Sequence, residues 1–352
     1  MTETVPRVTA DALQAFIARA FVAVAIPGDD AAVLGALIAE ADLRGSDTHG
    51  VFRMPPYVKR LRAGGINPRP CIRILQERAS TALIDGDNGM GHLAMKFAAE
   101  TAVRKAKETG IGWAGCRMTN HSGPAALYAM MPLADDMIGL TLAVGSANHL
   151  PAWGSIEPLL GTNPIAVAVP ADAEPPVVMD MSPTVAAYGK VRLKAARGEE
   201  MPVGWMIDRE GKPLTDPKRV EEGTLLPIGD YKGYALSLII GLLAGSLNAA
   251  AFGREIAELG KIPDAAANVG QSVVALSVEA FAPVAAFKRN VDAVIRNIRD
   301  AQRRPGVERT WLPGEQSHTK RQDRLENGIP MPAGLRKNLD ELATDLSIAP
   351  VM

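Results

Sequence analysis

The sequence of 352 residues predicts an α+β fold, in which a sheet is combined with helices at both ends of the chain. Short apolar runs rich in β-branched residues, bounded by glycine and proline, indicate strands in the middle of the chain. Only a few helical patterns separate these runs, which argues against regular β-α-β winding. Strands are expected at residues 72–75, 81–84, 138–144, 165–169, 177–181 and 271–278.

Apolar residues at helical spacing predict the helices, which lie mainly towards the two ends of the chain. Residues 45–70 are rich in proline and glycine and form a loop segment with a short helix near 57–61. The uncharged stretch 234–253 would just span a bilayer, but polar residues dilute it, so we expect a buried core helix. The other helices are expected at residues 13–24, after Pro27, at 94–108, at 184–197, after Pro283 and near the C-terminus.

The composition is that of an ordinary globular enzyme, with 47% hydrophobic residues. Lysine and arginine number 38 and aspartate and glutamate 39, so no basic excess points to nucleic acid or to a membrane surface. Cys71 and Cys116 are too few for a disulfide framework or a cysteine zinc cluster, and we expect two reduced, buried thiols. The N-terminus has no signal-peptide pattern, which predicts a cytoplasmic location.

Nucleotide-binding motifs are missing from the sequence. No G-x-G-x-x-G follows a predicted strand, and the glycine cluster at residues 86–91 has the wrong spacing for a dinucleotide fingerprint. A P-loop is absent as well. Motifs alone therefore predict no nucleotide site of the Rossmann type.

Three of the five histidines, His49, His121 and His149, lie in loop-like segments rich in serine, asparagine or glycine. A loop histidine can exchange a proton near neutral pH, although each one taken alone is more often structural. Arg53 follows His49 by four residues, so a short helix here would place both side chains on one face. A guanidinium beside a proton donor suits a 2-oxo acid, because it can grip the carboxylate while the donor reaches the neighbouring oxygen.

A metal centre is the competing interpretation of the same residues. Asp47, His49 and His121 could supply oxygen and nitrogen ligands, which would make the protein a metal-dependent hydrolase. No His-x-x-x-His, His-Glu-x-x-His or cysteine pair is present, so the spacing gives this alternative no support. We therefore expect no metal.

Eight motifs in order along the chain resemble the malate/L-lactate dehydrogenase family of the second type. This family includes ureidoglycolate and sulfolactate dehydrogenases, diketogulonate reductase and the Δ1-piperideine/pyrroline-2-carboxylate reductases. The motifs are the segments 42–55, 85–91, 120–121, 151–154, 160–164, 180–182, 226–233 and 312–315. The resemblance covers nearly the whole chain, and the shared order makes it specific although each motif is weak alone.

The resemblance implies a non-Rossmann fold in which a largely antiparallel sheet domain binds the nicotinamide cofactor. It implies a terminal helical domain of residues 1–75 with 283–352, a central sheet domain of 76–182 with 267–282, and an inserted helical domain of 183–266. It also implies a homodimer with the active site near the subunit boundary, and a small anionic substrate.

Site residues carried over by motif fall into three groups. His49 and His121 are the candidate proton donors or acceptors, with Thr48 at a relay position, and the resemblance leaves the choice between the histidines open. Arg53 is the expected carboxylate clamp, and Thr162 is an expected substrate contact. The expected cofactor contacts are His121, Ser122, Gly123, Asp180, Met181, Ser182, Asp230, Lys232, Pro313, Gly314 and Glu315.

Departures from the family pattern refine the function. Ser122 replaces an aromatic residue, which leaves a smaller and more polar wall. Asp230 could accept a ribose hydroxyl and repel a 2′-phosphate, which favours NAD over NADP, although Lys232 opposes this. Lys190 favours an oxo or hydroxy acid. We expect a 2-oxo/2-hydroxy acid dehydrogenase, with a ketimine reductase on the same scaffold as the nearest alternative and an inactive binding protein as a third.

Overall fold

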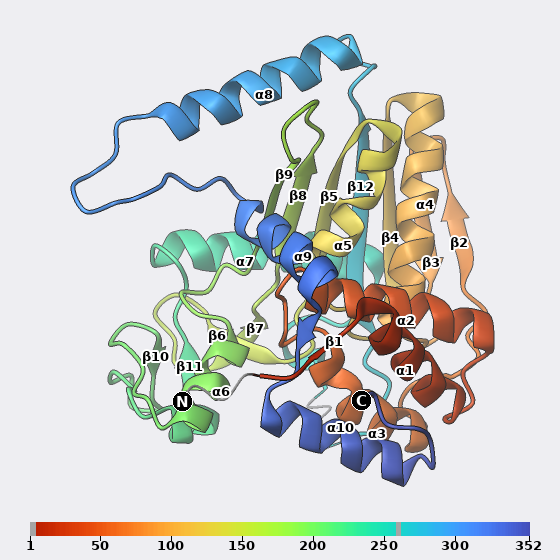
Figure 1. The fold of residues 1–352 in the computed structure, drawn as a ribbon, viewed down its shortest axis with the longest axis vertical. Helices are drawn as coiled ribbons and strands as arrows, with labels where there is room; N and C mark the ends of the chain where they lie inside the picture. Colours follow the sequence, from red (N-terminus) through yellow and green to blue (C-terminus); the bar gives the residue numbers. More distant parts are fainter. Residues whose placement is uncertain (1–4, 258–261) are drawn as a thin grey trace.

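The computed structural model describes residues 5–257 and 262–352, and a seven-stranded sheet forms its centre (Figure 1). Neighbouring strands are antiparallel except for β3 and β4, which run parallel. The predicted α+β class and the predicted, largely antiparallel sheet are therefore confirmed. In sheet order the strands are β2 (Arg73–Glu77), β3 (Thr81–Asp85), β4 (Ile111–Thr119), β12 (Val269–Ser277), β5 (Met137–Ala143), β8 (Ile165–Val169) and β9 (Val177–Met181).

Strand β4, next to the central strand β12, was not predicted, because small residues rather than β-branched ones fill it. Close packing explains those small residues. A Cβ atom on Gly112 would lie 1.9 Å from the Ala102 carbonyl oxygen, and one on Gly115 would lie 2.0 Å from the Asn248 side-chain oxygen. Strand β4 is thus held tightly between a helix on one face and the segment around Asn248 on the other.

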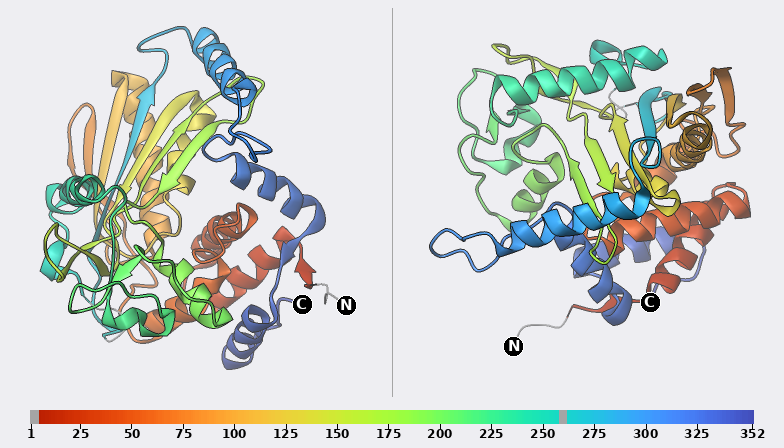
Figure 2. Two further views of the ribbon diagram at one scale, coloured as in Figure 1. Left: turned by 90° about the vertical axis from the view of Figure 1, so that its left-hand side faces the viewer. Right: turned by 90° about the horizontal axis from the view of Figure 1, so that it is seen from above.

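Helices cover both faces of the sheet. Helix α4 (Gly91–Thr109) joins β3 to β4 and packs against the face that carries Ala114 and Cys116. Helix α7 (Tyr231–Ala244) packs with Trp113 against the opposite face, as the alternation of side chains along a strand requires. Seen from above in Figure 2, α7 lies on one side of the strands and α2 with α8 on the other.

The prediction that the apolar stretch at 234–253 is a buried core helix is only half correct. Helix α7 starts earlier, at Tyr231, and buries Gly233, Ser237 and Ile240, but Ile239 is 52% exposed and Leu242 40%. It has one buried face and one exposed apolar face. No helix in the described ranges is both long enough and apolar enough to cross a membrane.

The two ends of the chain pack together beneath the sheet. Strand β1 (Arg7–Val8) pairs antiparallel with β13 (Ile329–Pro330), and one apolar core joins Phe16, Ile38 and Leu339. Figure 1 shows α8 lying apart at the far end of the molecule, with an extended segment leading back to α9. The helices of these two ends are α1 (Ala10–Val22), α2 (Gly28–Leu43), α3 (Met54–Arg62), α8 (Val284–Asp300), α9 (Glu315–Asn327) and α10 (Ala333–Asp345).

Helix α6 starts four residues later than the predicted 184–197. Thr184 instead forms a β-bridge with Pro227, and the Val185 N–H donates to the Leu226 carbonyl, so extended backbone precedes the helix. The remaining elements are short. They are α5 (Ala126–Ala129), α6 (Tyr188–Arg197), β6 (Asn148–Pro151), β7 (Pro158–Gly161), β10 (Met206–Ile207), β11 (Thr224–Leu225) and the 3-10 turns η1 (Val51–Arg53), η2 (Met131–Asp135), η3 (Pro217–Glu222), η4 (Ser246–Asn248) and η5 (Gly253–Glu255).

The two cysteines differ in their surroundings. Both are free, and Cys116 is buried in β4, where burial raises the pKa of its thiol to about 12. Cys71 is exposed, so the prediction of two buried thiols is wrong for this residue. It lies in the proline-rich segment just before β2, outside the apolar clusters.

Candidate functional site

One continuous segment brings a histidine, an arginine and a tyrosine to the same place. His49 closes a tight turn through its N–H to the Ser46 carbonyl, η1 ends at Arg53, and α3 follows with Tyr57 one turn later. The helix near 57–61 is thus confirmed and extended to Met54–Arg62. Residues 53 and 57 share a helix face, because they are four positions apart.

Asp42 anchors the turn that carries His49. Its buried carboxylate accepts the Val51 N–H at 2.7 Å, and a Cβ on Gly50 would lie 2.3 Å from that carboxyl group. Burial raises the pKa of Asp42 well above its usual value, despite the Val51 N–H. Gly50 is therefore needed for the close approach of the Asp42 carboxylate. This contact anchors the turn that leads into the helix beginning at Met54.

His121 is positioned by the loop that leaves β4. Its neighbour Asn120 donates from its side-chain amide to the Asn88 carbonyl (3.0 Å) and the Gly89 carbonyl (2.9 Å). The Asn120 side-chain oxygen accepts from the buried Arg60 at 2.6 Å. A Cβ on Gly91 would lie 1.9 Å from the Asn120 carbonyl, so the loop lies directly against the start of α4.

The two predicted histidines meet in the folded chain. The rings of His49 and His121 stack with centroids 5.5 Å apart and an angle of 28° between their planes. Thr48, predicted as a relay residue, places its hydroxyl oxygen 2.9 Å from Nδ1 of His49. The Tyr57 hydroxyl lies 2.5 Å from Nδ1 of His121.

Sequence reasoning missed Tyr57 and His92. His92 is fully buried in α4, and its ring meets the Tyr57 ring edge-on at 5.8 Å. Both ring nitrogens of His92 lack a hydrogen-bond partner. The spacing of Tyr57 from Arg53 was a usable indication for the tyrosine, whereas an aromatic residue inside a helix is ordinarily a core residue.

Among the described residues that meet here, Arg53 carries the positive charge and the three histidines are neutral near pH 7. Burial and the nearby Arg53 charge lower the pKa of His49 to about 4, and burial, Arg53 and the two neighbouring histidines hold the pKa of His121 well below 6.5. Burial lowers the pKa of His92 to about 3. Three neutral imidazoles therefore surround one guanidinium near pH 7.

Arg53 has no acidic partner among the residues that the structure describes. Its Nε is buried without a hydrogen bond, and no carboxylate of the described ranges lies within ion-pair distance of it. A half-buried cation without a counter-ion is costly. Arg53 is therefore available to pair with an anion from outside the described residues.

A cleft of about 210 Å³ is bordered by Pro124 and Ala126 of the loop that follows His121. Asp180 lines it and accepts the Ala126 N–H at 2.9 Å. Burial raises the pKa of Asp180 to about 6. The segment 313–314 closes another wall, where the Val178 N–H donates to the Pro313 carbonyl at 3.1 Å.

Gly314 fits closely at this wall. Its φ of +85° favours glycine, and a Cβ there would lie 2.7 Å from the Val178 carbonyl oxygen. Three of the segments predicted to touch the cofactor, those around residues 123, 180 and 314, thus border one cleft. Met181 ends β9 beside it, and the next residue, Ser182, hydrogen-bonds to the Thr184 hydroxyl at 2.8 Å.

Other predicted residues lie elsewhere or face other partners. Ser122 turns its hydroxyl inward to the Gln271 side chain at 2.5 Å, so it does not form the polar wall expected of it. The Gly123 N–H faces Nδ1 of His121 at 3.3 Å. Glu315 is buried, and Arg299 and Arg309 bind its carboxylate.

The segment 230–232 begins α7, with both Asp230 and Lys232 exposed. It approaches the strand end at residue 183, because a Cβ on Gly233 would lie 2.7 Å from the Pro183 carbonyl. Thr162 is half-buried after β7, and no hydrogen bond or ring contact of the described residues joins it to the histidines.

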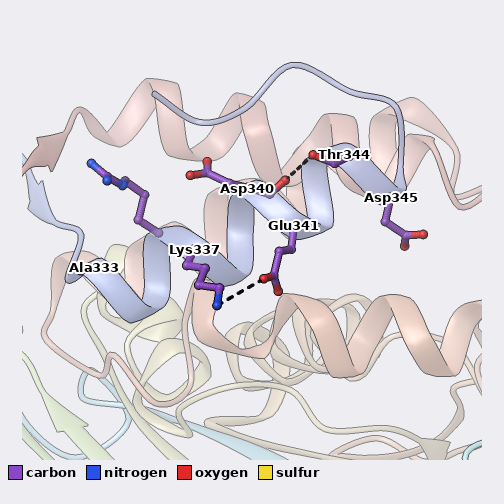
Figure 3. A pocket seen from close by; sticks show the side chains of 7 residues that line it. Ala333, Lys337, Asp340, Glu341, Thr344 and Asp345 are labelled. Carbon is purple, nitrogen blue, oxygen red and sulfur yellow. Dashed lines mark hydrogen bonds and ion pairs between the residues drawn. The ribbon is translucent and has the colours of Figure 1, made fainter.

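The alternative metal site does not assemble. The Asp47 carboxylate is bound by Arg324 at 2.5 Å, and no group of three histidine, cysteine or acidic side chains in the described ranges could hold a metal ion. A separate hollow runs along α10, lined by exposed polar side chains and the Lys337–Glu341 ion pair (Figure 3). It contains none of the predicted site residues.

Comparison with known proteins supplies the class and the family, because the relatives are dehydrogenases and reductases and the chain is accordingly an oxidoreductase that acts on CH–OH or C=N groups. The family model for malate/L-lactate dehydrogenase matches residues 8–340, and the chain belongs to this family. Malate dehydrogenase of Pyrococcus horikoshii is 35% identical over 350 residues, which cover 97% of this chain and 96% of that protein.

Two further relatives show the range of the similarity. The Δ1-pyrroline-2-carboxylate/Δ1-piperideine-2-carboxylate reductase of Pseudomonas putida is 31% identical over 343 residues, with 97% of this chain and 98% of that protein covered. The crystal structure of malate dehydrogenase from Entamoeba histolytica superposes with a TM-score of 0.94 at 28% identity, covering 98% of this chain and 99% of that one. The family resemblance predicted from eight motifs is thus confirmed.

Proposed function

We propose that the protein transfers hydride between a nicotinamide cofactor and C2 of a small 2-oxo or 2-hydroxy acid of the malate or lactate kind. The observation that carries this proposal is the Arg53 guanidinium, half-buried without a carboxylate partner among the described residues, beside the stacked rings of His49 and His121. A guanidinium binds a carboxylate through two parallel hydrogen bonds, which fixes the orientation of the acid. The carbon next to that carboxylate then lies near the imidazoles.

The chain's own residues would bind, orient and exchange a proton. Arg53 holds the acid group, and an imidazole hydrogen-bonds the C2 oxygen, where negative charge develops during reduction. The bound cofactor supplies or accepts the hydride. His49 and His121 stand close enough together for either to serve the same oxygen.

The cofactor would lie in the cleft bordered by Asp180, Ala126 and Gly314. This cleft is bordered by edge strand β9 of a largely antiparallel sheet, which fits a non-Rossmann mode of binding and the absence of a glycine fingerprint. Asp230 favours NAD over NADP, because a carboxylate repels a 2′-phosphate. Comparing the KM for NADH and NADPH in the wild type and in Asp230→Asn tests this preference, which should weaken in the variant.

The test of the function is a panel of acids with both reduced cofactors. Oxaloacetate, pyruvate, 3-sulfopyruvate and Δ1-piperideine-2-carboxylate are each offered with NADH and with NADPH, and absorbance at the nicotinamide band is followed. We expect turnover of an oxo acid in preference to the cyclic imine. Turnover of the imine alone would identify a ketimine reductase, and no turnover in either direction would contradict the proposal.

We also propose that the protein works as a homodimer. Helix α8 is bound to the body through Asp292 but leaves Val294 56% exposed and Ile298 39% exposed, and the turn that follows α7 exposes Leu247 at 62%. Apolar faces of this kind are expected to be covered, and a second copy presents the same faces. Light scattering during gel filtration should give twice the mass of the chain. A monomeric mass would contradict this proposal.

A further inference from the structure

The hydrogen bond between Tyr57 and His121 assigns a source for the reaction's proton, an inference that rests on the proposed function. We propose that Tyr57 is a positioning residue that acts through His121. It holds Nδ1 of the imidazole, so that Nε2 carries the proton offered to the substrate oxygen, and it replaces that proton from its own hydroxyl group. Arg53 then stabilises the tyrosinate that remains.

The direction of the hydrogen bond follows from its neighbours. Nδ1 of His121 faces two groups, the Tyr57 hydroxyl at 2.5 Å and the Gly123 N–H at 3.3 Å. A backbone N–H can only donate, so Nδ1 of the neutral ring is an acceptor. The Tyr57 O–H therefore donates to Nδ1 as well, and the ring's single proton lies on Nε2.

The hydroxyl of Tyr57 has no competing acceptor among the described residues. Its ring is fixed by packing, since the side chain is only 4% exposed and lies edge-on against His92. Arg53, one helical turn before it, brings a positive charge to the same hydroxyl group. Tyr57 thus lies between that charge and the His121 ring.

Proton balance explains why such a chain is useful. During reduction, hydride adds to C2 and the C=O bond becomes a C–O bond with negative charge on oxygen. The Nε2 proton of His121 moves to that oxygen, while the Tyr57 proton moves to Nδ1, so the imidazole stays neutral throughout. Before the next reduction the tyrosinate regains a proton from solvent and the imidazole returns to its Nε2-protonated form, and oxidation follows the same proton transfers in reverse.

The pKa shifts limit the imidazolium as a donor, whereas burial makes the Tyr57 hydroxyl a weaker acid, so the proposal rests on the geometry of the hydrogen bond. Burial, Arg53 and the neighbouring histidines lower the pKa of His121, so an imidazolium is scarce near pH 7 and cannot be the main donor. Burial raises the pKa of Tyr57 to about 12, while the charge and hydrogen bonding of Arg53 act in the opposite direction. The groups facing this pair are Arg53, His49, His92 and Tyr128, and none is an acid.

The decisive experiment compares the pH profiles of Tyr57→Phe and Tyr128→Phe. Tyr128 is a matched control, because it is also buried and its hydroxyl donates to a backbone carbonyl, that of Ser122, at 2.5 Å. Each variant keeps its aromatic ring and loses one buried hydrogen bond. Both should therefore lose a similar few degrees of Tm.

In the wild type and in Y128F we expect kcat for reduction to be nearly constant between pH 6 and 8. In Y57F we expect kcat at pH 8 to fall about 10- to 100-fold, and to recover by nearly tenfold for each unit of acidification, since only an imidazolium can then supply the proton. The KM for the oxo acid should change by less than about threefold. A flat profile in Y57F, or a loss equal to that in Y128F, would overturn the inference.

A second measurement needs neither substrate nor cofactor. Nitrogen-15 spectra of the wild-type histidines at pH 7 should show His121 protonated on Nε2, with an Nδ1 resonance that moves in Y57F and stays in place in Y128F. Protonation on Nδ1 would overturn the inference even if the protein proved to be an active dehydrogenase. Conversely, the expected spectra together with no turnover of any acid would leave the hydrogen bond assigned and contradict only the proposed function.

Discussion

Two groups of shielded charges in this protein differ in one respect, the presence of acidic partners. We call Glu174, Asp292, Arg296, Arg299, Arg309 and Glu315 the paired-charge cluster. Arg299 binds Glu174 at 2.5 Å and Glu315 at 2.9 Å, and Asp292 also accepts the N–H groups of residues 172–174. Arg53, beside the histidines, has no such partner within the described residues.

The comparison separates charges that hold the fold together from the charge that, under the proposed function, binds the acid group of the substrate. In the paired-charge cluster, removal of one partner leaves another charge uncompensated, so the cost falls on stability. Around Arg53 the cost has already been incurred in the folded chain, and a bound carboxylate offsets it. The two regions should therefore respond in opposite ways to neutral substitutions.

The largest expected effect is that of Arg53→Met on catalysis. Loss of a bidentate, charge-assisted contact should lower kcat/KM for the acid about 10³-fold, or roughly 4 kcal/mol, mainly through KM. The free energy of unfolding should stay the same or rise, because an unpaired cation is removed from a half-buried position. Steady-state kinetics and urea unfolding measure the two quantities.

Arg296→Met in the paired-charge cluster is the matched control, because Arg296 binds Glu174 and Asp292. This variant should keep kcat/KM within about threefold and lose up to about 1 kcal/mol of stability instead, since the Arg296 side chain is 56% exposed. An equal loss of cofactor and substrate binding in Arg53→Met would show that Arg53 does not act as the carboxylate clamp.

The second effect is that of Glu315→Gln on stability. Burial would raise the pKa of Glu315, but the Leu312 N–H, Arg299 and Arg309 outweigh it and hold the pKa below its usual value. The neutral amide leaves both arginines short of a partner, and we expect a loss of about 2 kcal/mol at pH 7, since the arginines are partly exposed. The carboxylate stabilises the fold above its unfolded pKa, and this contribution disappears as pH falls through the lower folded pKa. The variant should therefore differ less from the wild type in urea unfolding at pH 3 than at pH 7.

The sequence alone predicted that Arg53 lies beside His49. It did not predict the ion pairs of the paired-charge cluster. His49 and Arg53 are four residues apart, so a local pattern places them together. Tyr57 was missed because its partner His121 is 64 residues away in the sequence, and a contact across that distance follows from the fold of β4 and α3 rather than from any local pattern. The pairing of Glu315 with Arg299 is likewise set by how α8 and α9 meet.

The strands were predicted where their own side chains are typical of strands. They were missed where contacts with neighbouring elements determine which residues fit. Strands β8 and β9 matched their apolar, β-branched runs residue for residue. Strand β4 was not predicted because its glycines reflect tight packing rather than strand propensity. At Gly112 and Gly115 any Cβ atom would lie within about 2 Å of a neighbouring atom. Helix α6 was predicted too long because the bridge between Thr184 and Pro227 is not encoded near residue 184.

The third effect concerns a charge that the fold excludes. His92 is buried with both nitrogens unpartnered, and burial lowers its pKa to about 3. Between that value and the unfolded pKa of 6.5, the unfolded chain binds more protons, so stability falls as pH falls. This single group contributes a slope of about 1.4 kcal/mol per pH unit. In His92→Gln, the free energy of unfolding should fall less steeply between pH 6 and pH 4, by about that amount per pH unit. An unchanged slope would mean that His92 is charged or solvated in the folded state.

The smallest effect is expected on the surface, where the pairing of charges ceases to matter. Lys337 and Glu341 of α10 form an ion pair at 3.9 Å with side chains 76% and 65% exposed (Figure 3). Water screens such a pair, and lysine placed four residues before glutamate is the less favourable order for the helix dipole. Lys337→Ala should shift Tm by less than about 1 °C and leave kcat/KM unchanged. A larger loss of Tm would mean that the pair stabilises the fold, which would place Lys337 with the paired-charge cluster rather than among the screened surface charges.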